Sequence, residues 1–302
     1  MLYNKFSDYL ENRYGEKVYK LPINIPSTCP NRDGTISSKG CIFCGEEGAG
    51  FEMLSSALSV QEQLNINMKY IEKRYRAKKF IAYFQNYSNT YIPFEQFRKY
   101  VNESIADKIS AIYISTRPDC ISDEQLNFLK EIQYSKKIDI VVEIGLQTAN
   151  ENTLKILNRG HSVEDFKKAA ARIKSVNLGI CTHYIVDLPW DNTEDVIKGA
   201  RLLTELQVDQ VKVHSLYVLE NTLLGDMYKN KQFEPVCLNE YINRVICFLE
   251  NLSPEIVVQR LTGRAPKERT LFCNWGISWW KIRDMIEAEM HKRNTFQGKA
   301  LK

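Results

Sequence analysis

Short apolar runs alternate with longer segments of helical periodicity along most of the chain. The short runs are rich in Val, Ile, Phe and Tyr, which favour strands. They predict strands at 20–25, 79–84, 111–115, 138–145, 180–186 and 210–218. The longer segments repeat apolar residues at the spacing of helices that pack on a sheet. They predict helices at 60–75, 94–105, 123–133, 163–176 and 193–206.

Two of these helices carry residues typical of helix starts. Ser162 precedes the helix at 163–176 and has Asp165 three residues on, which predicts an N-cap. Thr193 is the corresponding candidate for the next helix, since Glu194 and Asp195 follow it and suit an acidic first turn.

Strands and helices that alternate in this way predict βα units and a parallel sheet. Right-handed crossovers curl such a sheet, and six units are too few for a closed eight-stranded barrel. The expected fold is α/β, a partial (β/α)6 TIM-like barrel over residues 1–235. A helix at 238–249, a strand at 255–261 and a helix at 277–291 predict a small C-terminal α/β extension over 236–302. No Gly/Ser linker separates the two, so we expect the extension to pack on the barrel.

The composition suits a globular protein. Of the 302 residues, 44% are hydrophobic and 26% charged, which is enough apolar material for a full core. No apolar run is long enough for a membrane span, and residues 1–20 do not resemble a signal peptide. We therefore expect a cytoplasmic protein that does not enter a membrane. The net charge of +4 permits an anionic partner without requiring one.

Three of the eight cysteines are clustered, with the spacing C-x11-C-x2-C at Cys29, Cys41 and Cys44. Clustered cysteines in a reducing compartment indicate metal ligands or catalytic thiols. Three thiolates can hold three irons of a [4Fe–4S] cluster and leave the fourth iron open. The loop follows the first expected strand, and active sites of α/β barrels lie at that end of the strands. We therefore expect an N-terminal cluster-binding loop.

Two other interpretations of these cysteines remain open. A structural zinc ion normally takes four protein ligands, but no His or fourth Cys lies within the loop. The thiols could also carry no ligand at all. The scattered cysteines are expected to be core residues or unpaired surface thiols. They are Cys120, Cys181, Cys237, Cys247 and Cys273.

With these residues the chain resembles the radical SAM (S-adenosylmethionine) superfamily, whose members carry three such cysteines and an aromatic residue before the last, here Phe43. More narrowly, it resembles the YhcC/YtqA-type family, which is related to the radical SAM domain of the Elongator catalytic subunit and to oxygen-independent coproporphyrinogen oxidase. The segments that carry the closer likeness are CPNRDGT at 29–35, FQNYSNTY at 84–91, STRPDC at 115–120, EIGLQTAN at 143–150, NRGH at 158–161 and QRLTGRAP at 259–266.

The resemblance implies an enzyme with a [4Fe–4S] cluster on Cys29, Cys41 and Cys44 and with bound SAM, which it cleaves reductively to a 5′-deoxyadenosyl radical. It also implies a SAM pocket with an aromatic wall, polar groups at the strand ends and a cation for the SAM carboxylate, as a zwitterionic cofactor requires. The implied SAM-binding residues are Phe43, Gln85, Asn86, Ser115, Gln147, Arg159 and His183.

The chain departs from the family pattern at two places. Relatives often have Gly-Leu-Pro-Gly after the fifth strand, where this chain has DLPW at 187–190. The second strand also lacks the Gly-Gly-Glu type of ending. Both departures bear on the contacts to SAM and leave the cysteine loop unaffected.

Structural roles are the simpler alternatives for several of the polar residues. Gln147 could cap a strand end, and Arg159 could pair with a neighbouring acid. Glu143 could be a buried ion-pair partner. His183 and His214 could be hydrogen-bonded core histidines.

The resemblance to the Elongator domain implies tRNA as substrate and chemistry on a wobble uridine. The resemblance to the closer family implies that the uridine side chain is shortened from carboxymethylaminomethyl to aminomethyl. Basic residues interleaved with aromatic ones can bind a phosphate backbone and stack bases. Three basic groups are candidates, at 69–79, 260–269 and 292–302, and the aromatic residues Phe272, Trp275, Trp279 and Trp280 follow the second. Solvated charged faces are the simpler explanation of such runs.

Two other classes of function stay open. An enzyme that acts on a small metabolite, for example by oxidative decarboxylation, agrees better with the modest net charge. A non-catalytic iron–sulfur protein would require the SAM-pocket residues to be coincidental. Both enzyme hypotheses, with tRNA or with a small metabolite as substrate, also imply a flavodoxin or ferredoxin-type electron donor.

Overall fold

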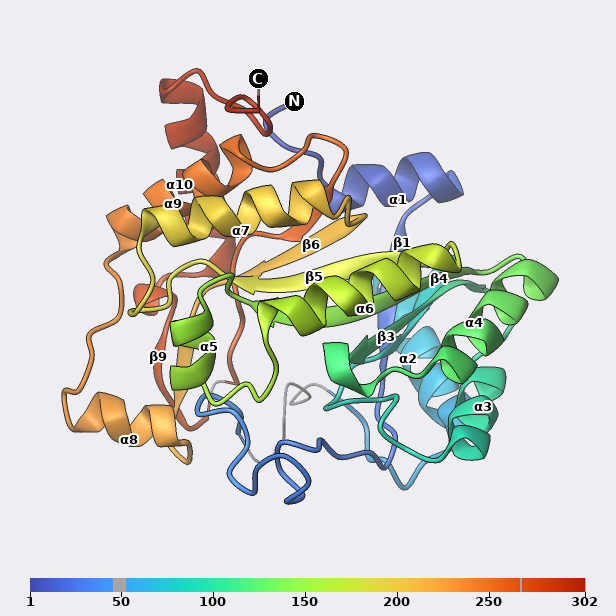
Figure 1. The fold of residues 1–302 in the computed structure, drawn as a ribbon. Helices are drawn as coiled ribbons and strands as arrows, with labels where there is room; N and C mark the ends of the chain where they lie inside the picture. The colour runs from blue at the N-terminus through green and yellow to red at the C-terminus, as the bar shows by residue number, and fades with distance from the viewer. Residues whose placement is uncertain (46–52, 267, 302) are drawn as a thin grey trace.

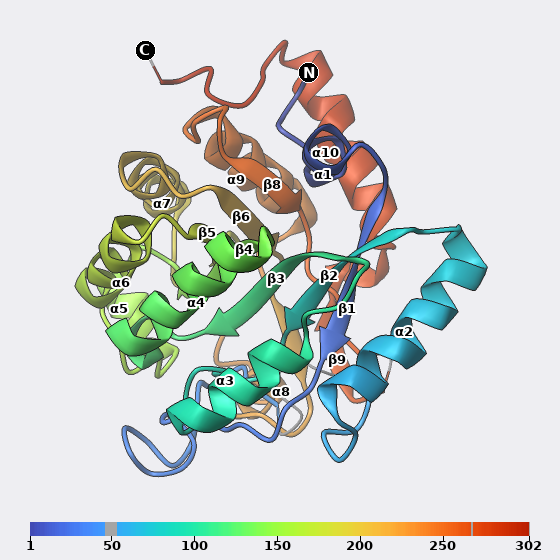
Figure 2. The same ribbon diagram turned by 90° about the vertical axis from the view of Figure 1, so that its right-hand side faces the viewer.

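The computed structural model describes residues 1–45, 53–266 and 268–301. Its centre is a curled sheet of seven parallel strands in the order β1-β2-β3-β4-β5-β6-β8 (Figures 1 and 2). These strands are β1 (Val18–Ile23), β2 (Lys79–Phe84), β3 (Ile109–Thr116), β4 (Asp139–Gln147), β5 (Gly179–Ile185), β6 (Gln210–His214) and β8 (Val257–Arg260). The sheet forms an open half barrel, so the predicted α/β partial barrel is confirmed.

Helices alternate with the strands and cover the outer face of the sheet (Figure 1). The α-helices of the described residues are α1 (Phe6–Tyr14), α2 (Val60–Tyr75), α3 (Phe94–Glu103), α4 (Asp123–Lys136), α5 (Glu151–Ile156), α6 (Val163–Ser175), α7 (Thr193–Glu205), α8 (Leu223–Lys229), α9 (Leu238–Glu250) and α10 (Trp279–Lys292), and α1 lies at one end of the barrel instead of on its outer face. In the described part of the chain, none of them has both the length and the apolar character needed to cross a bilayer.

Two strands differ from the sequence-based expectation. The run at 210–218 was expected as one strand, but it divides into β6 and β7 (Tyr217–Leu219), and β7 pairs antiparallel with β9 (Thr270–Cys273) in a separate small sheet. The expected strand at 255–261 is β8, which pairs with β6 as the seventh strand of the barrel. The C-terminal part of the chain therefore helps to build the barrel, while its division from the barrel at 235/236 stays a prediction.

The two faces of the strands differ in polarity because side chains alternate between them. The outward residues of β4 belong to the large apolar core that includes the outer helices, and they are Ile140, Val142, Ile144 and Leu146. The inward residues are different. Val141 packs in a second, smaller cluster, and Glu143 and Gln147 line an internal cavity. The barrel interior therefore becomes polar toward the carboxyl ends of its strands.

Helix α1 fills the opposite end of the barrel. Leu10, Phe6 and Tyr9 pack against the inward residues at the start of the strands, among them Ile81 and Val141. The helix contacts both β1 and β8, which are the two edges of the sheet, and the backbone just before it bonds to β8. The N-terminal segment thus covers exposed strand edges and closes the barrel at this end.

Capping explains where several helices begin. Ser162 caps α6, and its hydroxyl accepts from the backbone N–H of Asp165, as predicted. The start of α7 differs by one residue, because Asn192 is the N-cap and Thr193 is the first helical residue. An asparagine side chain reaches the N–H groups of the first turn as well as Ser or Thr does, so either residue suited the position.

Helix α7 approaches β5 most closely at Gly199, where an added Cβ would lie 2.1 Å from the hydroxyl oxygen of buried Tyr184. Alanine normally stabilises a helix interior by about 1 kcal/mol relative to glycine. We expect Gly199→Ala to do the reverse and to destabilise the protein by about 1–3 kcal/mol, because the methyl group would displace the Tyr184 ring. Thermal melting measures this effect. Lys198→Ala, on the exposed side of the same helix, is the control, and a Gly199→Ala protein that melts at or above the wild-type temperature contradicts this packing.

Candidate active site

A cavity of about 750 Å³ occupies the barrel interior and carries the cysteine loop at its rim. Cys29, Cys41 and Cys44 all line it. So do six of the predicted SAM-binding residues, which are Phe43, Gln85, Ser115, Gln147, Arg159 and His183. Asn86 is buried and lies outside this lining set, with its Nδ2 atom 3.5 Å from Asn24 Oδ1. The fold thus gathers residues from widely separated segments around one cavity.

The NRGH segment at 158–161 holds the cysteine loop from the other side of the barrel. Asn31 Nδ2 donates to the carbonyl of Asn158 at 2.6 Å, and Asn158 Nδ2 donates to the carbonyl of Gly40 at 2.7 Å. Gly160 lies so close to the loop that an added Cβ would come within 2.9 Å of Asn31 Oδ1. These contacts fix the position of the loop before any cofactor binds.

Hydrogen-bond donors face the sulfur atoms of two cysteines. Arg159 Nη1 lies 3.1 Å from Cys41 Sγ, and Asn31 Nδ2 lies 3.4 Å from the same atom. Arg32 Nη1 lies 3.5 Å from Cys44 Sγ. Burial, and then the nearby Cys41, raises the pKa of the Cys44 thiol to about 11, so at neutral pH its proton leaves only when a metal takes its place. Donors around the sulfurs suit an anionic iron–sulfur cluster.

The placement of the three cysteines also suits a multi-iron cluster. Each thiolate of a [4Fe–4S] cluster binds a different iron, so its ligands are spread around a rim and do not meet at one point. Cys29, Cys41 and Cys44 all line the same cavity. Within the described ranges, no three His, Cys, Asp or Glu side chains converge as ligands of a single metal ion.

Arg159 lies buried between the cysteine loop and β4. Its Nη2 atom donates to the carbonyl of Gly145 at 3.2 Å and contacts His161 Nε2 at 3.0 Å. Its Nε atom has no hydrogen-bond partner among the described residues. Gly145 makes room for this side chain, since an added Cβ would lie 3.0 Å from Arg159 Nη2. Arg159 therefore faces the cavity and the cysteine loop, with one donor left for a ligand.

Gln147 ends β4 in a left-handed backbone conformation, with φ of 73°. Such a conformation is uncommon outside glycine and costs on the order of 1 kcal/mol or more. The pairing of β4 with β5 shifts register at this point, between Gly145 and Gln147. Irregularities of this kind often re-aim a side chain next to an active site. Here the irregularity brings the Gln147 amide back over Gly145 and toward Arg159.

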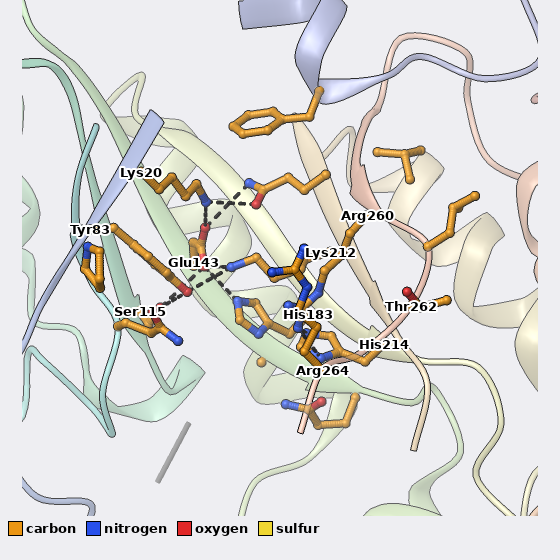
Figure 3. A pocket seen from close by; sticks show the side chains of 18 of the residues that line it. Lys20, Tyr83, Ser115, Glu143, His183, Lys212, His214, Arg260, Thr262 and Arg264 are labelled. Atoms are coloured by element: carbon orange, nitrogen blue, oxygen red, sulfur yellow. Dashed lines mark hydrogen bonds and ion pairs between the residues drawn. The ribbon is translucent and has the colours of Figure 1, made fainter. Parts of the chain in front are cut away.

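Glu143 is the centre of a buried polar network below the rim (Figure 3). Its carboxylate accepts from Lys20 Nζ at 2.6 Å, from Lys212 Nζ at 2.6 Å and from His183 Nε2 at 2.8 Å. Ser115 Oγ lies 3.4 Å from the same carboxylate. Burial alone would raise the pKa of Glu143, but the two lysines hold it well below its usual range. Glu143 thus has the structural role named above as its alternative, that of a buried ion-pair partner. His183 is hydrogen-bonded to it.

Aromatic rings surround the two lysines of this network. Lys20 Nζ lies 4.5 Å from the ring centre of Tyr83 and 4.2 Å from that of Tyr113. Lys212 Nζ donates to the Tyr83 hydroxyl at 2.8 Å. Rings and a shared carboxylate replace the water that a buried ammonium group loses. The lysines are therefore held in place and cannot swing freely toward a ligand.

His214 and Arg260 lie beside the network, at the ends of β6 and β8 (Figure 3). The rings of His183 and His214 stack with centres 5.1 Å apart, and Arg260 Nη2 lies 2.6 Å from His214 Nδ1. Burial and the neighbouring cations lower the pKa of His183 to about 4 and that of His214 well below its usual range. Both histidines are therefore neutral near pH 7.

Sequence analysis did not identify Lys20, Tyr83 or Lys212 as site residues, and it placed Arg260 in a basic group expected to contact phosphate. Lys20 and Lys212 each stand between apolar neighbours in their strands, so neither of them forms a motif. The usable signal was alternation, because a polar residue at an inward position of a buried parallel strand must face the barrel interior.

The basic residues predicted to contact phosphate lie in different environments, some at the surface and some along the cavity. In the first, Lys69, Lys73 and Arg74 are exposed at the end of α2. In the second, Arg260 and Arg264 both line the cavity (Figure 3), and Arg264 is also exposed, with its guanidinium 4.6 Å from the ring centre of Trp279. Lys267 of the second group and Lys302 of the third lie outside the described residues.

Among the aromatic residues, Trp275 packs against the core and donates to the carbonyl of Val236 at 2.8 Å. Trp279 lines the cavity, and Trp280 is about half exposed. Trp279 is therefore the indole that a ligand in the cavity could reach.

Family profiles match most of the chain. The profile described as the Radical SAM superfamily matches residues 23–213, and that of the Radical_SAM C-terminal domain matches residues 208–292. The protein YtqA of Bacillus subtilis (strain 168) is 30% identical over 298 residues, which cover 98% of this chain and 92% of YtqA.

Two further similarities involve proteins longer than this chain. The tRNA uridine(34) acetyltransferase of Methanocaldococcus infernus is 30% identical over 160 residues, which cover 52% of this chain and 29% of that enzyme. The solved structure of Elp3 from the same species, with residues 1–46 deleted, superposes with a TM-score of 0.69 at 18% identity. The alignment covers 93% of this chain and 64% of the Elp3 chain, and it supports the same fold.

The network around Glu143 predicts a large effect of a small substitution. Glu143→Gln keeps the shape of the side chain but leaves two buried ammonium groups without a counter-charge, and we expect it to destabilise the protein by about 3–5 kcal/mol. Glu103→Gln, which removes a surface partner 3.9 Å from Lys99, should cost less than about 1 kcal/mol. Denaturant unfolding of both variants measures the difference. Equal stabilities would contradict the role given to Glu143.

Proposed function

The chain belongs to the radical SAM superfamily, and from this membership we propose that it modifies the side chain of a wobble uridine in tRNA. As a member it is an enzyme that uses a [4Fe–4S] cluster and SAM. The finer proposal is the conversion of a carboxymethylaminomethyl group to an aminomethyl group. The alignment with the tRNA uridine(34) acetyltransferase, over about half of this chain, is the observation that carries it.

Cys29, Cys41 and Cys44 would bind three irons of the cluster and leave the fourth for the amino and carboxylate groups of SAM. The N–H groups of Arg159 and Asn31 at Cys41, and that of Arg32 at Cys44, would offset negative charge on the cluster sulfurs. Bound in this way, the two cofactors supply a carbon radical that can remove a hydrogen atom from an unactivated C–H bond.

Four residues of the lining are proposed to hold SAM. Arg159 would bind the SAM carboxylate, because it stands next to Cys41 and its Nε atom is unpartnered among the described residues. Phe43 would form an aromatic wall for the adenine. Gln85 and Gln147, at the ends of β2 and β4, would hold polar groups of the methionine and ribose parts. His183 and Ser115 bond within the Glu143 network and would support the pocket from below.

The rim of the cavity suits a nucleotide substrate. Arg264 stacks on Trp279, which lines the cavity, and such a cation and ring can bind a phosphate and stack a base. The exposed lysines and arginine at the end of α2 would add contacts to the tRNA backbone. We also propose a flavodoxin or ferredoxin-type protein as the electron donor, as the family chemistry requires.

The proposed reaction balances with SAM as the electron acceptor. Loss of one hydrogen atom and one electron from the carboxymethyl CH2 leaves a C=N bond to the amine nitrogen, and the protonated secondary amine of the substrate releases one proton over the whole reaction. Water hydrolyses that bond to the aminomethyl group and glyoxylate. The substrate loses two electrons in all, and SAM takes up these electrons and one proton to become methionine and 5′-deoxyadenosine. The protein's part is to exclude bulk water and to hold one C–H bond in reach.

A second candidate is an enzyme that acts on a small carboxylated metabolite. The cavity favours it, because its charged groups lie inside the barrel, where a free metabolite fits as well as a nucleotide side chain. The net charge of +4 also does not require a polyanionic partner.

The cysteine assignment is tested by single substitutions under anaerobic conditions. Cys41→Ala should lose the visible iron–sulfur absorbance and the cleavage of SAM, because a ligand is missing. Cys120→Ala is the matched control: burial, then Asp119 and to a smaller degree the nearby Cys29, raise the pKa of this thiol, so it lies near the loop without belonging to it, and the variant should keep both. Iron and zinc analysis of the purified proteins measures the metal content. Full cluster content in Cys41→Ala, or zinc in its place, contradicts the assignment.

The substrate is tested with tRNA from a strain that lacks this protein. Mass spectrometry of its nucleosides should show more carboxymethylaminomethyluridine and less of the aminomethyl form. The reduced, reconstituted enzyme should then convert that tRNA and release glyoxylate and 5′-deoxyadenosine in equal amounts. An unchanged nucleoside profile, together with no conversion in vitro, would refute the tRNA proposal and favour the small metabolite.

A further inference from the structure

Arg260 is a partly buried cation with a fully buried Nε atom, and no carboxylate of the described residues forms an ion pair with it. It ends β8 and lines the cavity, and its Nη2 atom contacts the ring of His214. Its Nε atom has no hydrogen-bond partner among the described residues. No ion pair within those residues includes it, in contrast to Arg244 and Arg283, which are both paired with acids.

The groups around Arg260 leave the interior short of negative charge. Lys20 and Lys212 share the single carboxylate of Glu143. His214, the direct partner of Arg260, is neutral near pH 7, and its ring can accept from the guanidinium without compensating the charge. Among the described residues, the ion pairs of Glu143 with lysine therefore go to Lys20 and Lys212, and no ion pair reaches Arg260.

A guanidinium group cannot escape this imbalance by losing its proton. A buried charge without a counter-ion is costly, whereas a planar carboxylate can accept two parallel hydrogen bonds from the same fork. Arg260 lines the cavity, and its unpartnered Nε atom is a donor that such a fork could use. Arg260 therefore suits the carboxylate of a ligand.

We propose that Arg260, with His214 beside it, binds the carboxylate of the substrate inside the barrel. This inference rests on the proposed function, in which the substrate side chain ends in a carboxymethyl group. The SAM carboxylate is a different anion, because Arg159 stands at Cys41 in the cysteine loop whereas Arg260 stands at His214 on β6. The subsite would orient the side chain so that the CH2 next to the carboxylate is the one that reacts.

A carboxylate suits this position better than a backbone phosphate. The cavity of about 750 Å³ must also hold SAM, and a phosphodiester would bring its two flanking nucleosides into the same space. A terminal carboxylate on a flexible side chain needs little room. Arg264 at the surface is better placed for phosphate.

The test uses the reconstituted holoenzyme with SAM and four probes. The probes are the nucleoside 5-carboxymethylaminomethyluridine, its carboxamide, 5-aminomethyluridine and inorganic phosphate. Calorimetric titration should show that the wild type binds the acid at least about tenfold more tightly than the amide, since a hydrogen-bonded charge contributes this much. Arg260→Gln should weaken binding of the acid by about 10- to 100-fold and leave the amide unchanged.

Two further variants separate a lost contact from a lost fold. Arg260→Lys keeps the charge without the fork and should bind the acid with intermediate affinity. Arg172→Gln removes an exposed arginine that pairs with Asp123 on the outer helices, and it should stay within twofold of the wild type. Iron content and substrate-free cleavage of SAM should be the same in all variants, which excludes damage to the cofactor site.

Several outcomes would overturn the proposal. These are equal binding of acid and amide by the wild type, undiminished binding of the acid by Arg260→Gln, and tighter binding of phosphate than of the acid. Failure of the proposed function looks different. In that case tRNA is not converted, but a simple N-substituted glycine such as N-benzylglycine still binds with the same dependence on Arg260, and the subsite would serve a small metabolite.

Discussion

The carboxylate of Glu143 is the contact on which the barrel interior depends. It accepts hydrogen bonds from Lys20 on β1 and from Lys212 on β6, so it ties together strands that are far apart in the curled sheet. The same carboxylate bonds His183 on β5. A buried ion network is satisfied only in one geometry, which gives the polar layer a defined arrangement. The cavity above it therefore has a rigid floor.

This layer separates an apolar region of the barrel from a region that holds charged groups. Below it, α1 packs into the barrel with apolar side chains, and Phe6 and Leu10 line that end of the cavity. Above it, the cysteine loop, Arg159 and Gln147 surround space for charged cofactors. The charged layer faces both regions, because lysine stems are apolar and their ends are polar. An apolar layer in place of the Glu143 network would leave the charged groups of a ligand without polar contacts. Without any layer, water would reach the site of a radical reaction.

Two arginines are proposed to bind the two anions of the site, one anion each. Arg159 stands at the cysteine loop, and Arg260 stands across the cavity at β8. Each has a buried Nε atom without a partner among the described residues, so each is an incomplete contact in the protein alone. A substrate that carries its own carboxylate would complete one of them while SAM completes the other. This division explains how one cavity can distinguish cofactor from substrate.

The sequence alone determined the α/β partial barrel, the loop with Cys29, Cys41 and Cys44, and the family, because periodicity and motif spacing are local properties of the chain. It failed where the outcome depends on distant segments. The run at 210–218 became two strands in different sheets because β9, more than fifty residues on, offered a separate partner. Likewise, only the folded barrel decided that Lys20, Lys212 and Arg260 belong to the site. Which inward side chains meet is set by strand order and register across the curled sheet, and those follow from long-range packing that no local pattern records.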